Sequence, residues 1–147
     1  PKSFMDGLGL PIFESLPIVQ AMLSEEGVRS KLKLISAGKL VDARRQLVAM
    51  SMGADACLSA RGFMMALGCI QALQCNQNTC PVGITTHDHH LQRGLDIEAK
   101  STRIANYVNG LCHDHEEMLA ALGRRSASEL TQEDLFVCRS TEDAGFS

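Results

Sequence analysis

The 147-residue chain has no long apolar run and no excess of basic residues, and each absence argues against a class of protein. Its longest nearly uncharged apolar stretch, residues 63–73, is far shorter than the ~18–20 residues that a membrane-spanning helix needs. No charged segment followed by an apolar one opens the sequence, so we expect a cytoplasmic protein that is neither secreted nor bound to a membrane. Fourteen Lys and Arg against seventeen Asp and Glu give a net charge of −3, which argues against a nucleic-acid partner.

Internal repeats, low-complexity tracts and linkers rich in Pro, Gly or Ser are also missing. We therefore expect one continuous structural unit, with polar tails at residues 1–3 and from about residue 139 onward. Apolar residues make up 45% of the sequence, which is enough to bury the core of a single domain.

The six cysteines are too few for a small scaffold held together by disulfides. Three of them, Cys69, Cys75 and Cys80, are close together in the sequence, whereas the others are scattered. In a cytosolic protein such a group indicates ligation of a metal ion or an iron–sulfur cluster.

The hydrophobic pattern predicts helices that alternate with two short strands. Strands separated by a covering helix favour a parallel pair joined by a right-handed crossover. The expected elements are a helix from an N-cap at Ser15 to Gly27, a strand at 31–36, a helix from a cap at Asp42 to Met52, a strand at 54–58, a helix at 63–73, a helix at 97–123 and a short capped turn from Thr131 to Asp134.

Helix geometry sets a condition on the three cysteines. Within one helix, Cys69 and Cys75 would lie ~9 Å apart along the axis and about 120° apart around it, too far for one cluster. The helix must therefore unwind after about Leu73, and the loop formers Asn76, Asn78 and Pro81 allow this.

Three interpretations of these cysteines remain open. Three thiolates suit a three-iron cluster, and they also suit a zinc ion whose fourth ligand is one of the nearby histidines. The third interpretation is that they are small buried hydrophobic residues near a helix end. The histidines concerned are His87, His89 and His90, although a segment of this composition is more typical of a solvated loop.

Two glycine-containing turns follow the predicted strands, Ser36-Ala37-Gly38-Lys39 and Ser59-Ala60-Arg61-Gly62. Each presents backbone N–H groups where a small residue lets a phosphate approach, and the second opens a helix whose N-terminus favours an anion. Lys39 and Arg61 add positive charge. Two successive strand ends that bind one phosphate are typical of the last two strands of a (β/α)8 barrel, although turns of this kind are also common without any ligand.

Residues 53–83 combine the second strand end with a Cys-x5-Cys-x4-Cys segment that is followed by Pro-Val-Gly. This stretch resembles the FMN-binding domain of the glutamate synthase family, as does Leu-Gln-Arg-Gly-Leu at 91–95. A looser similarity extends from Phe4 to Phe136. The resemblance implies an α/β fold that is the C-terminal portion of a (β/α)8 TIM barrel, with its last two strands and helices followed by a helical C-terminal extension. Residues 1–96 would form the barrel part, with a cluster loop at 69–80, and residues 97–147 the extension.

The resemblance also implies two cofactors, FMN and a 3Fe–4S cluster. It assigns the cluster to Cys69, Cys75 and Cys80, and no catalytic residue to this chain. Carried onto this sequence, the FMN phosphate positions and their turns are Ser36, Ala37, Gly38, Lys39, Ser59, Ala60 and Arg61.

Enzymes of this family reduce an imine formed from 2-oxoglutarate and ammonia to L-glutamate. The implied partners are the remainder of the barrel, a glutaminase domain or subunit, and ferredoxin or an NAD(P)H-oxidising flavoprotein as electron donor. Two barrel strands hold at most one end of a flavin, so we expect the chain to be inactive by itself. The rival hypotheses are a non-catalytic electron-transfer or zinc-stabilised binding module, and a catalytically dead fragment that packs on a partner through an apolar edge.

Overall fold

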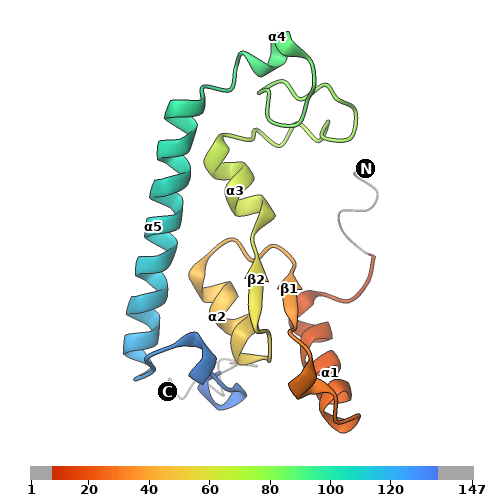
Figure 1. The fold of residues 1–147 in the computed structure, drawn as a ribbon, viewed down its shortest axis with the longest axis vertical. Coiled ribbons are helices and arrows are strands. Elements are labelled where there is room, and N and C mark those ends of the chain that lie inside the picture. The colour runs from red at the N-terminus through yellow and green to blue at the C-terminus, as the bar shows by residue number, and fades with distance from the viewer. Residues whose placement is uncertain (1–7, 136–147) are drawn as a thin grey trace, which may run out of the picture.

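The computed structural model describes residues 8–135, which form a mixed α/β fold around a small parallel sheet (Figure 1). The polar tails expected at the two ends of the sequence, with Phe136 and Cys138, lie outside the described residues. Within residues 8–135, no helix is both long and apolar enough to cross a lipid bilayer.

The first helix, α1, runs from Ile12 to Glu25, and its predicted start at Ser15 is wrong. Pro11 occupies the N-cap, where its carbonyl accepts hydrogen bonds from the N–H groups of Glu14 and Ser15. The Ser15 hydroxyl instead donates to the carbonyl of Ile12 at 3.4 Å. The helix therefore starts one turn earlier, because a proline with extended backbone ends the preceding segment.

The sheet consists of β1 (Ile35–Ala37) and β2 (Ala56–Leu58), which are parallel as predicted. Ile35 pairs with Ala56, and Ala37 with Leu58. Both strands are shorter than expected, and residues 29–31 form a 3-10 turn, η2, in place of the start of the first strand. Among residues 8–135, each strand pairs with one neighbour only, so regular pairing is confined to the three residues where the two backbones meet.

Helix α2 (Ala43–Ser51) connects the strands and covers one face of the sheet. Its start is as predicted, because the Asp42 carboxylate accepts a hydrogen bond from the Arg45 N–H at 2.8 Å. The core beside it consists of four buried apolar residues, Leu16, Leu40, Ala49 and Ala54. On the opposite face of the sheet, Ile35 and Leu58 are 58% and 59% exposed.

Helix α3 (Ala60–Leu67) begins directly after β2 and ends at Gly68, which is left-handed with φ 97°. The prediction of a helix over 63–73 was wrong at both ends, because the helix begins at Ala60 and Gly68 ends it at Leu67, six residues before Leu73. The expectation that the helix ends before Cys75 is confirmed. A long loop then leads to the short helix α4 (His89–Gln92), which lies farther from the sheet than α3, at the top of Figure 1.

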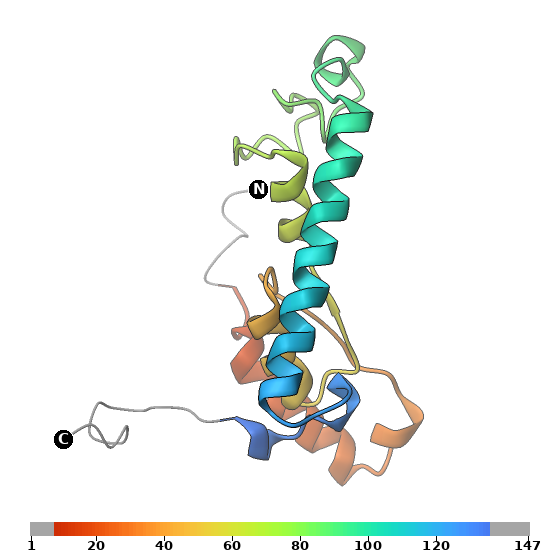
Figure 2. The same cartoon turned by 90° about the vertical axis from the view of Figure 1, so that its left-hand side faces the viewer.

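Helix α5 (Ile97–Ala121) packs along α3 and α2 and spans most of the length of the described chain (Figure 2). The Asp96 side chain caps it by accepting from the Ala99 N–H at 3.0 Å. Two 3-10 turns follow, η3 (Ala127–Glu129) and η4 (Gln132–Asp134). The predicted capping pair of Thr131 and Asp134 is present, and it stabilises η4.

Candidate functional site

The turns after β1 and β2 lie next to each other at the same edge of the sheet. This follows from the register, because Ala37 pairs with Leu58 in a parallel ladder and the chain leaves both strands in the same direction. Beyond this pair, Gly38 and Lys39 have φ values of 151° and 58°, so the first turn bends sharply away from the strand. The prediction from the sequence that the two turns lie side by side is therefore confirmed.

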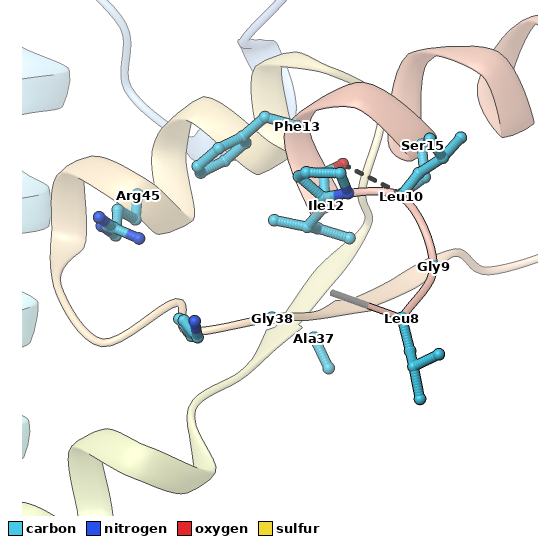
Figure 3. Close-up of a pocket in the computed structure, with 11 residues that line it drawn as sticks. Leu8, Gly9, Leu10, Ile12, Phe13, Ser15, Ala37, Gly38 and Arg45 are labelled. Carbon is cyan, nitrogen blue, oxygen red and sulfur yellow. Dashed lines mark hydrogen bonds between the residues drawn. The ribbon is translucent and has the colours of Figure 1, made fainter. Parts of the chain in front are cut away.

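The first turn borders a cavity that is also lined by the start of α1 (Figure 3). Two basic side chains, Lys39 and Arg45, line this cavity, and Arg45 comes from the first turns of α2. Ile12 lies over Gly38, where a Cβ atom would come within 3.0 Å of the Ile12 Cβ. The cavity thus combines an apolar wall with positive charge.

The second turn contacts α5 through a tyrosine. The hydroxyl of Ser59 lies 3.0 Å from the hydroxyl of Tyr107 and makes no capping bond to α3. A Cβ atom at Gly62 would come within 2.0 Å of the Tyr107 hydroxyl oxygen. The sequence pattern predicted that this small residue lets a phosphate approach, whereas in the structure the tyrosine occupies the space beside it.

Arg61 lines a different cavity from Lys39. Its neighbours there include Met64, Cys69 and Cys75, so its side chain belongs to the surroundings of the cysteine loop. The two basic residues that the sequence grouped together therefore line separate cavities.

The three cysteines of the loop line one small apolar cavity beside the end of α3. Cys69 is partly exposed, Cys75 is exposed and Cys80 is buried. Within residues 8–135, no three Cys, His, Asp or Glu side chains are close enough to hold a metal ion. The three thiols thus line the same cavity, but their sulfurs are not close enough together to ligate one metal ion.

Cys80 has the most distinctive environment of the three. The pKa of its thiol is lowered from 9.0 to about 7, and the backbone N–H of Thr85 is the largest cause. The N–H groups of Val82 and Ile84 and the Thr85 hydroxyl also lower this pKa, whereas burial raises it. The N–H groups of Val82, Ile84 and Thr85 therefore favour the thiolate form of this buried thiol.

The loop between α3 and α4 contains three residues other than glycine in the left-handed region. Gln71, Leu73 and Asn78 have φ values of 57°, 58° and 62°. Asn78 is held by two hydrogen bonds: its carbonyl accepts from the Thr86 hydroxyl at 2.7 Å, and its side-chain oxygen accepts from the His87 N–H at 2.6 Å. Left-handed backbone is unfavourable for Gln and Leu by about 1–2 kcal/mol each, so this loop carries local strain.

The histidines that the sequence offered as zinc ligands, His87, His89 and His90, are exposed at the start of α4. His89 Nδ1 lies 3.2 Å from Gln92 Oε1, and the His90 N–H donates to the Asp88 carboxylate at 2.8 Å. The predicted exposure of this segment is confirmed, but His89 and His90 belong to helix α4 and not to a loop.

Three residues of this region were missed by sequence reasoning: Arg45, Thr85 and Tyr107. Arg45 and Thr85 lie in segments whose local pattern carries no binding motif. Tyr107 is the only tyrosine of the chain, and it lies on the partly buried face of α5. A lone polar aromatic residue on a helix is the one signal that could have drawn attention to this position.

Comparison with known proteins gives consistent matches over most of the chain. A family model described as a conserved region in glutamate synthase matches residues 1–125. The glutamate synthase large subunit-like protein YerD of Bacillus subtilis (strain 168) is 43% identical over 128 residues, which cover 87% of this chain and 24% of that protein. The archaeal glutamate synthase (NADPH) of Methanocaldococcus jannaschii is 34% identical over 130 residues, or 88% of this chain and 26% of that protein.

The chain thus spans about a quarter of the length of these two relatives. The large chain of glutamate synthase (NADPH) from Azospirillum brasilense is 30% identical over 88% of this chain, which is 8% of that longer protein. The family model covers both strands, the cysteine loop and all of α5. The chain therefore belongs to the glutamate synthase family of oxidoreductases.

Proposed function

We propose that this chain supplies the last two strands of a (β/α)8 barrel in an FMN- and iron–sulfur-dependent glutamate synthase. The observation that carries the proposal is the arrangement at one end of the sheet: two adjacent strand-end turns, followed by a loop whose three thiols surround one cavity. Ligands of barrel enzymes bind at the carboxyl ends of the strands, and phosphate sites often follow the last two. Membership of the glutamate synthase family supports the same assignment.

The remainder of the barrel is the first partner in this proposal. The sheet face that carries Ile35 and Leu58 is apolar and exposed, whereas Ser36 on the other face is buried. An exposed apolar sheet face with open edges requires further strands or another layer to cover it. The further proposed partners are a glutaminase domain or subunit and an electron donor, either ferredoxin or an NAD(P)H-oxidising flavoprotein. We propose the cytoplasm as its location.

The FMN phosphate is proposed to bind between the two turns, at Ser36, Ala37, Gly38 and Lys39 on one side and at Ser59, Ala60 and Arg61 on the other. The first N–H groups of α3 have no side-chain cap, so they are available to an anion. Lys39 and Arg45 add positive charge beside the first turn. These residues would fix the phosphate end of the flavin and leave its ring to the rest of the barrel.

The cysteine loop fits a 3Fe–4S cluster by the chemistry of its donors. Three thiols line one cavity, and the N–H groups of Val82, Ile84 and Thr85 lower the pKa of the buried Cys80 thiol. Hydrogen bonds to cysteine sulfur stabilise the anionic state of iron–sulfur centres. Ligation would draw Cys69 and Cys75 towards Cys80, and its free energy would offset the strained backbone of the loop. Bound together, the flavin and the cluster would supply the electron transfer for reduction of an imine, derived from 2-oxoglutarate and ammonia, to L-glutamate.

The experiment loads the chain with FMN, and separately with iron and sulfide or with zinc, and records absorption and electron paramagnetic resonance spectra. We expect FMN retention and a broad brown absorption with the paramagnetic signal of an oxidised three-iron cluster. Stoichiometric zinc without any iron–sulfur chromophore would favour the binding-module hypothesis instead. We expect no glutamate from 2-oxoglutarate and ammonia by the chain alone, and steady turnover would show that its site is more complete than proposed.

A further inference from the structure

Tyr107 connects the loops that follow the two strands. Its hydroxyl donates a hydrogen bond to the carbonyl of Val41 at 2.9 Å, and Val41 lies just beyond the turn after β1. The same hydroxyl lies 3.0 Å from the Ser59 hydroxyl, directly after β2. Because the phenol has a single proton and gives it to Val41, Ser59 is the donor in the second bond.

Neighbouring residues fix the tyrosine ring in this position. Phe63 contacts it edge-on, with the ring centroids 5.3 Å apart and an interplanar angle of 83°. Gly62 leaves space for the hydroxyl that any side chain would fill. The ring is thus held from α3, while its hydroxyl reaches past α3 to the two loops.

The bond to Tyr107 also fixes the orientation of the Ser59 side chain. Serine at the start of a helix commonly caps the first free N–H groups. Here its oxygen lies 3.0 Å from the Tyr107 hydroxyl and accepts no capping bond from the N–H groups of α3. The first turn of α3 therefore keeps donors that can bind an external anion.

We propose that Tyr107 is a positioning residue for the phosphate site, which makes α5 part of that site. This inference rests on the proposed function, because it assumes that the strand-end turns bind the FMN phosphate. Tyr107 holds the Ser59 turn against the loop at Val41, and it holds the Ser59 side chain in an orientation that does not cap α3. Its contribution is the relative placement of two anion-binding segments, without contact to the cofactor.

The test compares Tyr107→Phe with wild type in the affinity of the 147-residue chain for FMN, measured by equilibrium dialysis. The substitution keeps the ring and removes both hydrogen bonds, so we expect about tenfold weaker binding of FMN. Ser101→Ala is the matched control, because it removes another hydroxyl of α5 that donates only to the Glu98 carbonyl of the same helix. Its FMN affinity should equal that of wild type.

A second comparison separates positioning from stability. Phe63→Leu loses the ring contact but keeps the Tyr107 hydroxyl, so we expect a lower unfolding midpoint with FMN affinity within about twofold of wild type. Ser59→Ala should weaken FMN binding by itself, and combined with Tyr107→Phe it should add little, because both changes break the same bond. If Tyr107→Phe fails to fold, backbone hydrogen exchange at residues 39–41 in Ser59→Ala tests the inference instead, because Ser59 itself belongs to the proposed phosphate site.

Hydrogen exchange of the backbone at residues 39–41 and 59–62 provides a readout that needs no cofactor. Tyr107→Phe should raise exchange in both segments and leave α2 unchanged. If wild type does not bind FMN, the proposed function fails, and unchanged exchange in both segments would overturn the positioning role as well. If wild type binds FMN and Tyr107→Phe binds it equally well, only the positioning role is overturned.

Discussion

Arg29 Nη2 lies 2.8 Å from Oδ2 of Asp55, and this pair joins the start of β2 to the turn before β1. The same arginine nitrogen donates to the Gly53 carbonyl at 2.8 Å, and Asp55 Oδ2 accepts from the Leu34 N–H at 2.7 Å. Both side chains are largely buried, at 20% and 25% exposure. The network closes the end of the sheet opposite the candidate site and thereby fixes the strand register that the site depends on.

Asp55→Asn should lower the free energy of unfolding by about 1.5–3 kcal/mol, because several hydrogen bonds to a charged group are weakened at once. The Leu34 N–H is the largest cause of the lowered pKa of Asp55, with further contributions from Lys33 and Arg29 against the effect of burial. The stabilisation should therefore be present above the ordinary pKa of 3.8 and disappear as the pH falls through the lower value of the folded state. Urea unfolding at several pH values measures the loss of stability and its pH dependence. Asp114→Asn, at an exposed position of α5, is the control. Equal stability of the two variants would contradict the prediction.

Gly62→Ala should destabilise the chain by about 1–3 kcal/mol, because the new Cβ atom would overlap the Tyr107 hydroxyl. Gly110→Ala is the matched control, since nothing lies within 4 Å of a Cβ atom at this position of α5. Alanine there should raise stability by about 0.5–1 kcal/mol through helix propensity. Thermal unfolding of the two variants should shift in opposite directions, and a shift in the same direction would count against the packing described for Tyr107.

The Cys80 thiol should make stability depend on pH in the neutral to alkaline range. Its pKa is lowered from 9.0 to about 7, so its contribution to stability is fully present above 9.0 and is lost as the pH falls through 7. The free energy of unfolding should thus rise between these pH values in wild type and rise less in Cys80→Ser. Cys112→Ser, which changes an exposed cysteine on α5, should behave as wild type. A parallel rise in all three proteins would show that the Cys80 sulfur is not held as a thiolate.

Cys75→Ser should abolish the iron–sulfur absorption of the reconstituted chain, because two thiols do not hold a three-iron cluster. Cys112→Ser should retain it in full. Iron and acid-labile sulfide analysis quantifies the difference between the two variants. Full incorporation into Cys75→Ser would remove this cysteine from the proposed ligand set.

The exposed sheet face should drive self-association of the isolated chain. Ile35→Thr combined with Leu58→Thr should reduce the associated fraction in sedimentation velocity, because these side chains are 58% and 59% exposed on an apolar face. Ile97→Thr, at a residue that is 79% exposed at the start of α5, is the control and should leave association unchanged. The face is not the contact surface if all variants associate alike.

Some of this protein follows directly from local sequence chemistry. The Asp42 cap of α2 and the capping pair of Thr131 and Asp134 depend on side chains that bind backbone groups within the same turn. The parallel strand pair follows from the order of strand, helix and strand, so the two strand-end turns could be placed together. The end of the helix before Cys75 was also predictable, because helix geometry separates Cys69 from Cys75.

Other features were decided only by the tertiary structure, because they depend on residues far apart in the chain. Lys39 lines a cavity together with the start of α1, and Arg61 lines one together with the cysteine loop, because of how α1 and α3 pack. The lowered pKa of the Cys80 thiol arises chiefly from the Thr85 N–H, in a loop whose path no periodic pattern specifies. The role of Gly62 is set by Tyr107, forty-five positions later in the sequence, which approaches only once α5 lies along α3. Local patterns therefore determined where the elements and turns lie, and long-range packing determined which side chains meet there.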